Sequence, residues 1–413
     1  MTAERSVSGA TICLVGINYA PESTGIAPYT TVMARKLAAA GATVRVITGV
    51  PHYPQWAVQD ARYRSPGPWR EQDGDVDVLR VAHHVPPRAD LQGRGRMEFD
   101  FWRRARAIVR RTSADAIVAV TPSLSGLAAA VSGAKGRPVG AIVQDLTGLG
   151  AAESGSTGRG VAQVLGAVEV ALLRRTVATG VIAPRFAELL GEAGVPPERI
   201  VDLPNFTHIV PSAVDRAAAR RALGWPENAL LAVHTGNMGQ KQGLGVVVDA
   251  ARLAQQRGSE VTFYLVGDGN QRADLQRDAQ GVPGVRFIEP LGDKEYPLAL
   301  AAADVLLLTE RPGVREMCLP SKLTSYSVAG RPVVASTEPD GITGRLLSET
   351  GAGLLAAPGD AGALLDAVLR IGRDAELGHR VAAAGLKLAQ ERYSAVAAGE
   401  RYVDFVGQVL DER

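Results

Sequence analysis

The sequence has few of the residues that build disulfide frameworks or metal clusters. Two cysteines, Cys13 and Cys318, lie far apart in a chain of 413 residues. A disulfide scaffold and a cysteine-rich metal site are therefore excluded. The charges almost cancel, with 45 basic and 43 acidic residues, and this excludes a surface built to coat nucleic acid. We expect a reduced, cytoplasmic protein without a nucleic-acid partner.

Long apolar runs are also missing. Val161–Leu173 and Leu298–Leu308 are each interrupted by an acidic residue, whereas a membrane-spanning helix needs about 20 apolar residues. The apolar run near the start, Ile12–Ile17, is too short for a signal peptide. The sequence predicts a protein that at most rests peripherally on the inner face of the cytoplasmic membrane.

Lysine is scarce, since only six of the 45 basic residues are lysines. A coding bias toward arginine is sufficient to explain this. A lysine in a loop that follows a strand is nevertheless a stronger candidate for anion binding, because its compact ammonium binds anions differently from a guanidinium. Two of the six, Lys241 and Lys322, follow predicted strands.

Short apolar, β-branched segments alternate with longer amphipathic segments along most of the chain. In the first half we expect strands at Thr11–Ile17, Thr43–Thr48, Val76–Val81, Ala116–Val120, Val139–Val143, Gly180–Ala183 and Ile200–Leu203. Between them we expect helices at Tyr29–Ala40, Met97–Thr112, Leu124–Ala134, Gly160–Val177 and Arg185–Ala193. Strands without a polar face that alternate with helices indicate a parallel sheet covered on both sides.

The alternation pauses between Leu203 and Pro226, a stretch with three prolines, and then restarts. Further strands are expected at Leu230–His234, Val261–Val266, Val285–Ile288, Val305–Leu308 and Val333–Ala335. Helices are expected at Leu244–Arg257, Gln271–Gln280, Leu319–Ala329, Asp360–Ile371, Glu376–Arg392 and Ala397–Leu410. The fold class is therefore α/β, with two Rossmann-like doubly wound domains. We place the first domain at residues 1–205, with 393–413 packing back on it, and the second domain at residues 206–392. In such sheets ligands bind beyond the carboxyl ends of the strands, so we expect a site in a cleft between the domains.

Three loops of the second half could hold an anion or a nucleotide. The loop after Leu230–His234 contains Gly236, Asn237 and Lys241 before a helix, although a solvated lysine is an equally good interpretation. It lacks the spacing of a P-loop. The turn Gly267-Asp268-Gly269 brings backbone close to a ligand, and Glu289-Pro290-Leu291 follows the next strand, where its backbone could border a flat base. A plain turn explains the first of these equally well.

The stretch Thr309–Leu323 combines charges with a predicted helix start at Pro320-Ser321-Lys322. Proline suits the first helical turn, and the free N–H groups there point at an anion. Glu310 and Glu316 could accept hydrogen bonds from sugar hydroxyls, or they could be ordinary surface carboxylates.

In the first half, Gly25 permits a close backbone approach in the loop after the first strand, which could also be an ordinary turn. Asp145 follows Val139–Val143 and either projects into the cleft or caps the next turn. Asp75 and Asp77 have a spacing that can hold a metal, but they begin a strand, at the wrong end for this site. We therefore expect no metal and no cofactor.

The segment Gly93–Arg111 contains seven arginines and a predicted helix with Met97, Phe101 and Ile108 on one side. We favour a solvated helix that packs this stripe on the sheet. The alternative is a helix that lies on an anionic membrane surface.

Six blocks together resemble one family. They are GINYAPESTGIAPYT, TGVPHYPQW, IVQDL, TGNMGQKQGL, VGDG and LPSKL, in this order between about residues 11 and 335. The chain resembles the family 4 glycosyltransferases of GT-B architecture, and within them the colanic acid fucosyltransferases of the WcaI type. The helical tail resembles the closing helix that crosses back to the first domain in this family.

The resemblance implies a retaining, metal-independent enzyme in which positive groups stabilise the leaving nucleoside diphosphate. It implies that Lys241 neutralises the donor diphosphate and that Lys322 faces the phosphates. The chain departs from many family members at Asn237, where they have Arg, and at Gln144, where they have His. The positions of their paired glutamates fall on Met317 and Ser325.

We therefore expect transfer of a sugar from a nucleotide donor, with GDP-fucose as the first candidate, to a lipid-linked oligosaccharide for an exopolysaccharide. The alternatives are a nucleotide-sugar 2-epimerase on the same fold and a non-catalytic nucleotide-sugar-binding subunit. The residues predicted to act in catalysis are Asp145, Lys241, Lys322 and Glu316. Those predicted to bind the donor are Gly25, Gly236, Asn237, Gly267, Asp268, Gly269, Glu289, Pro290, Leu291, Glu310, Pro320 and Ser321.

Overall fold

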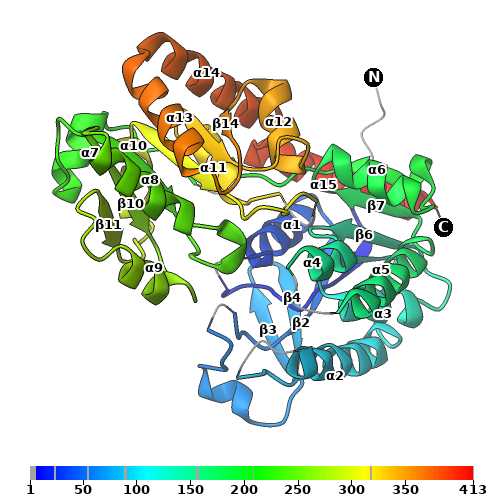
Figure 1. The fold of residues 1–413 in the computed structure, drawn as a ribbon. Helices are drawn as coiled ribbons and strands as arrows, with labels where there is room; N and C mark the ends of the chain where they lie inside the picture. Colours follow the sequence, from blue (N-terminus) through cyan, green and yellow to red (C-terminus); the bar gives the residue numbers. More distant parts are fainter. Residues whose placement is uncertain are drawn as a thin grey trace. The chain divides into compact units, whose positions relative to one another are not determined.

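The computed structural model describes residues 6–22, 25–53, 55–87, 91–154, 158–207, 209–316 and 319–412. The chain divides into two compact units, one formed by Met1–Asn205 with Ala395–Arg413 and the other by Phe206–Ser394. Each unit is a mainly or wholly parallel sheet with helices against it (Figure 1). The predicted fold class, α/β with two doubly wound parallel sheets, is confirmed.

The first sheet has the strand order β3-β4-β2-β1-β5-β6-β7-β8, and all neighbours are parallel except β3 and β4. Its strands are β1 (Thr11–Val15), β2 (Thr43–Gly49), β3 (Trp69–Asp73), β4 (Val76–Val81), β5 (Ala116–Val120), β6 (Val139–Val143), β7 (Ala178–Val181) and β8 (Ile200–Asp202). The central strands β5 and β6 are buried along their whole length, as the apolar runs predict.

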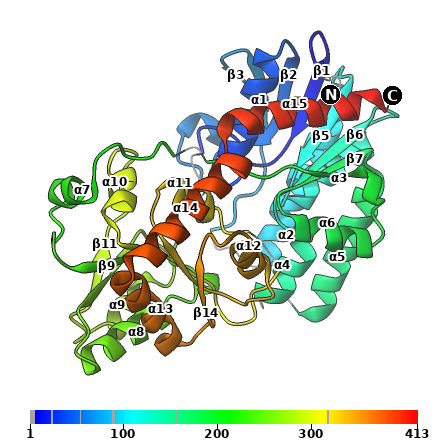
Figure 2. The same cartoon turned by 90° about the horizontal axis from the view of Figure 1, so that it is seen from above.

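The helices of this unit are α1 (Ala27–Ala39), α2 (Leu91–Val109), α3 (Leu124–Gly133), α4 (Thr147–Ser154), α5 (Arg159–Leu173), α6 (Pro184–Glu192) and α15 (Ala395–Asp411), with short 3₁₀ turns at Ala61–Arg64 and Pro197–Arg199. The C-terminal helix α15 packs on α1 and on β5, β6 and β7 (Figure 2). The α-carbon of Gly140 leaves room for Val409 and Phe405 of α15, so the last helix completes the core of the first unit.

The second sheet has the order β11-β10-β9-β12-β13-β14, and all its neighbours are parallel. Its strands are β9 (Leu230–Thr235), β10 (Val261–Val266), β11 (Val285–Ile288), β12 (Val305–Thr309), β13 (Val333–Ser336) and β14 (Leu354–Ala356). Its helices are α7 (Arg216–Leu223), α8 (Gly245–Gln256), α9 (Arg272–Asp278), α10 (Glu295–Ala302), α11 (Lys322–Val328), α12 (Ile342–Thr350), α13 (Ala361–Arg373) and α14 (Ala375–Arg392), with a 3₁₀ turn at Gln240–Gln242.

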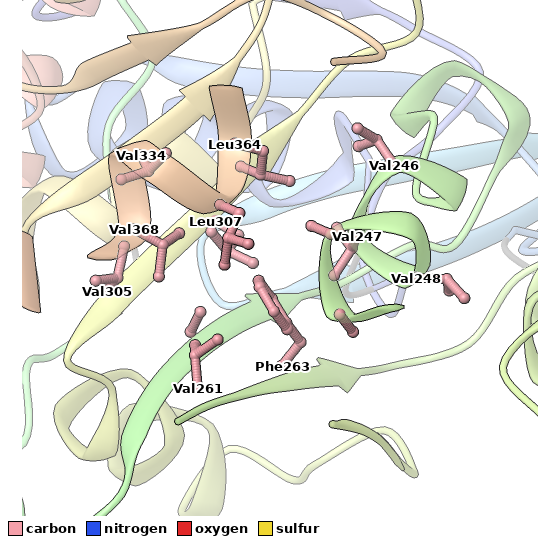
Figure 3. Close-up of a cluster of buried hydrophobic side chains, with 14 of the residues drawn as sticks. Val246, Val247, Val248, Val261, Phe263, Val305, Leu307, Val334, Leu364 and Val368 are labelled. Carbon is pink, nitrogen blue, oxygen red and sulfur yellow. The ribbon is translucent and has the colours of Figure 1, made fainter. Parts of the chain in front are cut away.

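One face of this sheet is covered by α8 and α13. Val247 of α8 and Val368 of α13 are fully buried together with Phe263 of β10 and Leu307 of β12 (Figure 3). A second apolar cluster, which includes Tyr326 of α11, covers the opposite face. The two layers hold the strands rigidly, so the loops at their carboxyl ends start from fixed positions.

The structure differs from the predicted elements in polar or irregular segments. The strands β3 and β14 and the helices α4, α7, α10 and α12 were not predicted. The helix α7 lies inside the proline-rich pause, where Asp215 caps its N-terminus and Gly224 ends it in a left-handed conformation. Strand β3 was missed because its sequence, WREQD, is polar and its residues are at most half-buried.

The arginine-rich helix α2 turns its apolar side inward. Met97, Phe101, Ala105 and Val109 are buried, and the helix packs on α3. The buried stripe therefore continues through Val109, and Ile108 is only half-buried, contrary to the prediction. The favoured interpretation, a helix that packs its stripe on its own domain, holds. No helix among the described residues is long and apolar enough to cross a membrane.

Candidate functional site

The carboxyl ends of β9, β10 and β12 lie next to one another at one edge of the second sheet. Strand β9 is hydrogen-bonded to β10 on one side and to β12 on the other, and all three run parallel. The loops that follow these strands contain Gly236, Asn237 and Lys241, then Gly267, and then Glu310. The sequence therefore predicted correctly that these segments end at the same edge.

The glycine turns after β9 and β10 pack closely against each other through their backbones. The Gly236 N–H donates to the Val266 carbonyl at 2.9 Å, and the Met238 N–H donates to the Asp268 carbonyl at 2.8 Å. Gly267 has φ +131°, and a β-carbon there would collide with the Gly236 carbonyl oxygen. Only glycine fits such a position. Gly236 and Asn237 are exposed at the surface of these packed turns.

Lys322 lies at the start of α11 with a neutral partner. Its Nζ is 3.2 Å from Nε2 and 3.4 Å from Nδ1 of His234, which is fully buried at the end of β9. Burial, followed by the charge of Lys241, lowers the pKa of Lys322 to about 7, and Glu310 opposes this in part. Burial and the Lys322 charge hold the pKa of His234 well below its usual value. Within the described residues no carboxylate lies within ion-pair distance of the Lys322 ammonium.

Lys241 lies on the 3₁₀ turn after β9 and is exposed. Its carbonyl accepts a hydrogen bond from the Arg311 N–H at 2.8 Å, which ties the loop after β9 to the loop after β12. Its charge acts on both Lys322 and Glu310. Two lysines from different loops therefore lie close enough to repel each other when the site is empty.

Glu310 points into the protein. Thr337 donates to its Oε2, and Thr343 donates to Oε1 at 3.2 Å, so both carboxylate oxygens are engaged. Burial raises the pKa of Glu310 to about 7, although these hydrogen bonds and the two lysines act against it. Thr337 and Thr343 were not recognised in the sequence. Thr337 follows β13, and Thr343 lies on α12. No local sequence pattern connects them to Glu310, which lies 27 and 33 positions earlier.

The helix α11 begins later than predicted. It spans Lys322–Val328, Ser321 is its N-cap, and Pro320 lies before the cap rather than in the first turn. The Ser321 side chain makes no capping hydrogen bond. One turn further on, the Ser325 hydroxyl donates to the Lys322 carbonyl at 2.9 Å and contacts the Tyr296 hydroxyl at 3.1 Å. Ser325 and Tyr296 therefore form a hydroxyl pair one turn after Lys322.

The loops after β10 and β11 are joined by an ion pair that the sequence did not predict. Arg272 of α9 donates to both carboxylate oxygens of Glu289, at 2.7 and 2.5 Å, and to the Gly267 carbonyl at 3.1 Å. The Glu289 side chain is 80% exposed, and Pro290 and Leu291 continue the loop beside it. Asp268 receives the Gly269 N–H on its own carboxylate at 2.8 Å.

Glu316 and the candidate metal ligands complete the predicted site. Glu316 is half-buried and precedes residues 317–318, so Met317 and Cys318 lie outside the described residues. Groups of three or more acidic, histidine or cysteine side chains that could hold a metal ion are absent from the parts of the chain that the structure describes. Asp77 is exposed and lies 3.7 Å from Arg45, in the first unit.

In the first unit, a buried carboxylate holds together the loops after β1 and β2. Glu22 Oε1 accepts the backbone N–H groups of His52 and Tyr53, both at 2.8 Å, and Oε2 accepts from the Asn18 amide at 2.8 Å. Gly25 has φ +65°, and a β-carbon there would lie 3.3 Å from the Tyr53 ring. Gly25 therefore lies against the Tyr53 ring, and its approach to a donor stays a prediction.

Two histidines lie beside this carboxylate. The rings of His52 and His83 are 4.9 Å apart and nearly perpendicular, and Nδ1 of His52 donates to the Val50 carbonyl at 2.9 Å. Burial, followed by the neighbouring His52, lowers the pKa of His83 to about 4. The contact of His52 with Glu22 joins residues 30 positions apart, so no local sequence pattern predicts it.

Asp145 and Gln144 follow β6. Asp145 is half-buried between β6 and α4. Gln144 is buried, and its Oε1 accepts from the Asn205 amide at 2.8 Å. Gln144 is therefore held by Asn205, a residue at the end of the first unit.

Known protein families match both units. The sequence model described as "Glycosyl transferase 4-like domain" matches residues 24–205, and that described as "Glycosyl transferases group 1" matches residues 229–374. WcaI of Escherichia coli K12, named as a colanic acid biosynthesis glycosyl transferase, is 32% identical over 348 residues. That alignment covers 79% of this chain and 83% of the relative.

Solved structures share the fold. Sucrose-phosphate synthase from Thermosynechococcus elongatus superposes with a TM-score of 0.76 at 18% identity, over 98% of this chain and all of the other. HepE from Anabaena in complex with UDP-glucose gives a TM-score of 0.66 at 18% identity, over 96% and 99% of the two chains. The two-domain fold, the matches of both units and the similarity to WcaI lead to one conclusion: the chain belongs to the family 4 type of group 1 glycosyltransferases and is a glycosyltransferase.

Proposed function

We propose that this glycosyltransferase retains the configuration of the sugar and transfers it from a nucleotide-sugar donor to a lipid-linked oligosaccharide in exopolysaccharide biosynthesis. GDP-fucose is the first candidate for the donor. The diphosphate of the donor binds at the carboxyl edge of the second sheet, and the reaction needs no metal ion. WcaI, the relative named for colanic acid biosynthesis, supports a role in exopolysaccharide biosynthesis.

The observation that carries the proposal is the cationic pair Lys322 and Lys241. A half-buried ammonium whose pKa is lowered to about 7 is destabilised by its surroundings, because its partner His234 is neutral and its neighbour Lys241 is positive. A diphosphate would relieve both effects, since charge-assisted hydrogen bonds to an anion contribute about 1.5–3 kcal/mol each. The complex of HepE with UDP-glucose shows that a protein of this fold holds a nucleotide sugar.

The same two lysines would assist the chemistry. Negative charge develops on the leaving diphosphate as the bond from the sugar to the phosphate oxygen breaks, and fixed cations stabilise that charge. In many other enzymes a divalent metal performs this role. Glu310 is held away by Thr337 and Thr343, so its carboxylate is kept from competing with the diphosphate for the lysines.

On the acceptor side, the arginines of α2 would keep the enzyme at an anionic membrane surface. Arg103 and Arg104 are exposed and Arg106 is half-buried, on a helix whose apolar side is already buried. The attraction would be electrostatic and worth about 1 kcal/mol per arginine near the surface. Replacing all three with glutamine should weaken binding to anionic vesicles. Unchanged vesicle binding would remove this part of the proposal.

The test is to supply separate GDP- and UDP-sugars to the purified protein, with and without a polyprenyl-diphosphate saccharide, and to measure the nucleoside diphosphate released. The expected result is acceptor-dependent release from one donor, with the anomeric configuration retained in the product. Recovery of the donor as a new stereoisomer without release would indicate an epimerase instead. Binding of donor with neither reaction, across a panel of acceptors, would indicate the non-catalytic alternative.

A further inference from the structure

The helix α5 exposes apolar side chains on its outer side. Val161, Val164 and Val168 are 40%, 62% and 45% exposed, at spacings of three and four residues that put them on one face of the helix. Ala171 continues the same face and is also exposed. We refer to Val161, Val164, Val168 and Ala171 as the α5 face. Each large side chain on this face leaves apolar surface in water.

The opposite side of α5 already supplies all the packing that the first unit needs. Ala162 and Leu173 are buried, and Glu169, the single acidic residue of the helix, is buried with its carboxylate accepting the Thr147 N–H at 3.0 Å. A β-carbon on Gly148 of α4 would lie 2.5 Å from the Gly166 α-carbon, so α4 and α5 are tightly packed. A helix that is apolar on all sides is normally buried. The α5 face therefore calls for a partner outside this unit.

An exposed arginine lies at each end of the α5 face. Arg159 begins the helix and Arg175 lies just after its end, and both are exposed. The helix α2, with its exposed Arg103 and Arg104, lies on the same side of the first sheet, with α3 packed against both α2 and α5 (Figure 2). The charge pattern is an apolar strip with cations beside it. This arrangement is typical of helices that bind anionic lipid bilayers.

We propose that the α5 face is a membrane-docking surface that enters the outer part of an anionic lipid bilayer, while the neighbouring arginines contact the lipid headgroups. A second copy of the chain is the poorer fit, because a symmetric contact would bring the same arginines against each other. The proposal rests on the proposed function only for its purpose, which is access to a lipid-linked acceptor. It does not depend on the donor site.

The test compares Val164→Glu/Val168→Glu with the wild type in sedimentation with vesicles of phosphatidylcholine and phosphatidylglycerol that contain no acceptor. We expect the vesicle affinity to fall at least about tenfold, because two valines lose their contact with hydrocarbon. Val396→Glu is the matched control, since Val396 is 67% exposed on α15, on the other side of the first sheet, and should leave vesicle binding unchanged. Both variants place charge on exposed positions, and GDP affinity and thermal unfolding should match the wild type.

Equal vesicle binding by Val164→Glu/Val168→Glu and the wild type would overturn the proposal. A wild-type dimer that this variant dissociates, seen by analytical ultracentrifugation, would also overturn it and identify the α5 face as a protein interface. Loss of vesicle binding with GDP affinity unchanged would support it. Failure of the donor site would be seen separately, as an absence of GDP binding in the wild type.

Discussion

The two sheets end in loops of opposite electrostatic character. At the carboxyl edge of the second sheet, the charge of Lys241 acts on Lys322, and the Glu310 carboxylate is turned into the protein by hydrogen bonds from Thr337 and Thr343. At the carboxyl edge of the first sheet, the Glu22 carboxylate is saturated by hydrogen bonds from the protein, and His83 is kept neutral by burial. The second edge therefore brings two cations within reach of each other, whereas the Glu22 carboxylate at the first edge is hydrogen-bonded within the protein.

The difference shows that a shared architecture does not decide what a site binds. Both sheets are parallel and both present loops at their carboxyl ends, so the scaffold offers two equivalent positions. The side chains on the loops make the two positions chemically different, as expected when function depends on the site and not on the fold. The proposed function accordingly assigns the donor diphosphate to the lysines of the second unit.

The largest effect is expected from Lys322→Ala, which removes the half-buried cation. Transfer should fall about 100- to 1,000-fold in kcat/KM, because a fixed group that stabilises developing negative charge is lost. Lys322→Arg should restore little, since a planar guanidinium does not place its charge and donors as a compact ammonium does. Lys387→Ala is the control, as that lysine is 75% exposed on α14, and its kinetics should match the wild type. Near-normal transfer by Lys322→Ala would contradict the claim that the lysine-bearing edge stabilises the leaving diphosphate.

Glu22→Ala should affect stability rather than nucleotide binding. It would leave the buried N–H of His52 and the N–H of Tyr53 without their acceptor, at a cost of about 2–4 kcal/mol in the free energy of unfolding. Urea denaturation would measure this cost, and calorimetry should give an unchanged GDP affinity. A loss of GDP affinity without a loss of stability would show that the first unit takes part in anion binding, contrary to the account.

The affinity for GDP should weaken as the pH rises. Lys322, whose pKa is lowered to about 7, is charged below pH 7 and loses its proton above it, while Glu310, whose pKa is raised to about 7, gains negative charge over the same range. Both changes disfavour an anion, so the affinity should fall about tenfold between pH 6 and 8 for Lys322 alone. Titrations at several pH values would measure this. The slope should be smaller in Lys322→Ala, and an equal slope would assign the effect to other groups.

Lys241→Ala should have a smaller effect than the change at Lys322. The Lys241 side chain is exposed, so water screens its attraction to an anion, and we expect a two- to fivefold loss of GDP affinity, of about the size measured for exposed ion pairs. The variant should also raise the pKa of Lys322, because a neighbouring positive charge is removed. The pH dependence of GDP binding would then shift to higher pH, and an unshifted profile would contradict the proximity of the two lysines.

Removing divalent metal should have no effect on transfer. The proposed site neutralises the leaving diphosphate with lysines, so activity after dialysis against EDTA should equal that of the untreated enzyme. Full restoration by added magnesium after a complete loss would overturn this part of the account.

The apolar strands and the glycine loops could be predicted from the sequence, because local patterns determine them. The run VTFYLV followed by Gly267 gives both a buried strand and the turn after it. The contact of Lys322 with His234 and the withdrawal of Glu310 by Thr337 could not be predicted, since they join residues 88 and 27 positions apart. In helix α5 the sequence does not show which side is buried, because the outer face and the inner face are both apolar.

The most direct test of the central claim is hydrogen–deuterium exchange with and without GDP. The account predicts slower exchange in residues 236–243 and 267–271 of the second unit, and no such protection in Lys322→Ala at the same GDP concentration. Protection confined to residues 18–22 and 50–53 of the first unit, or equal protection in Lys322→Ala, would contradict the assignment of the anion to the lysine-bearing edge.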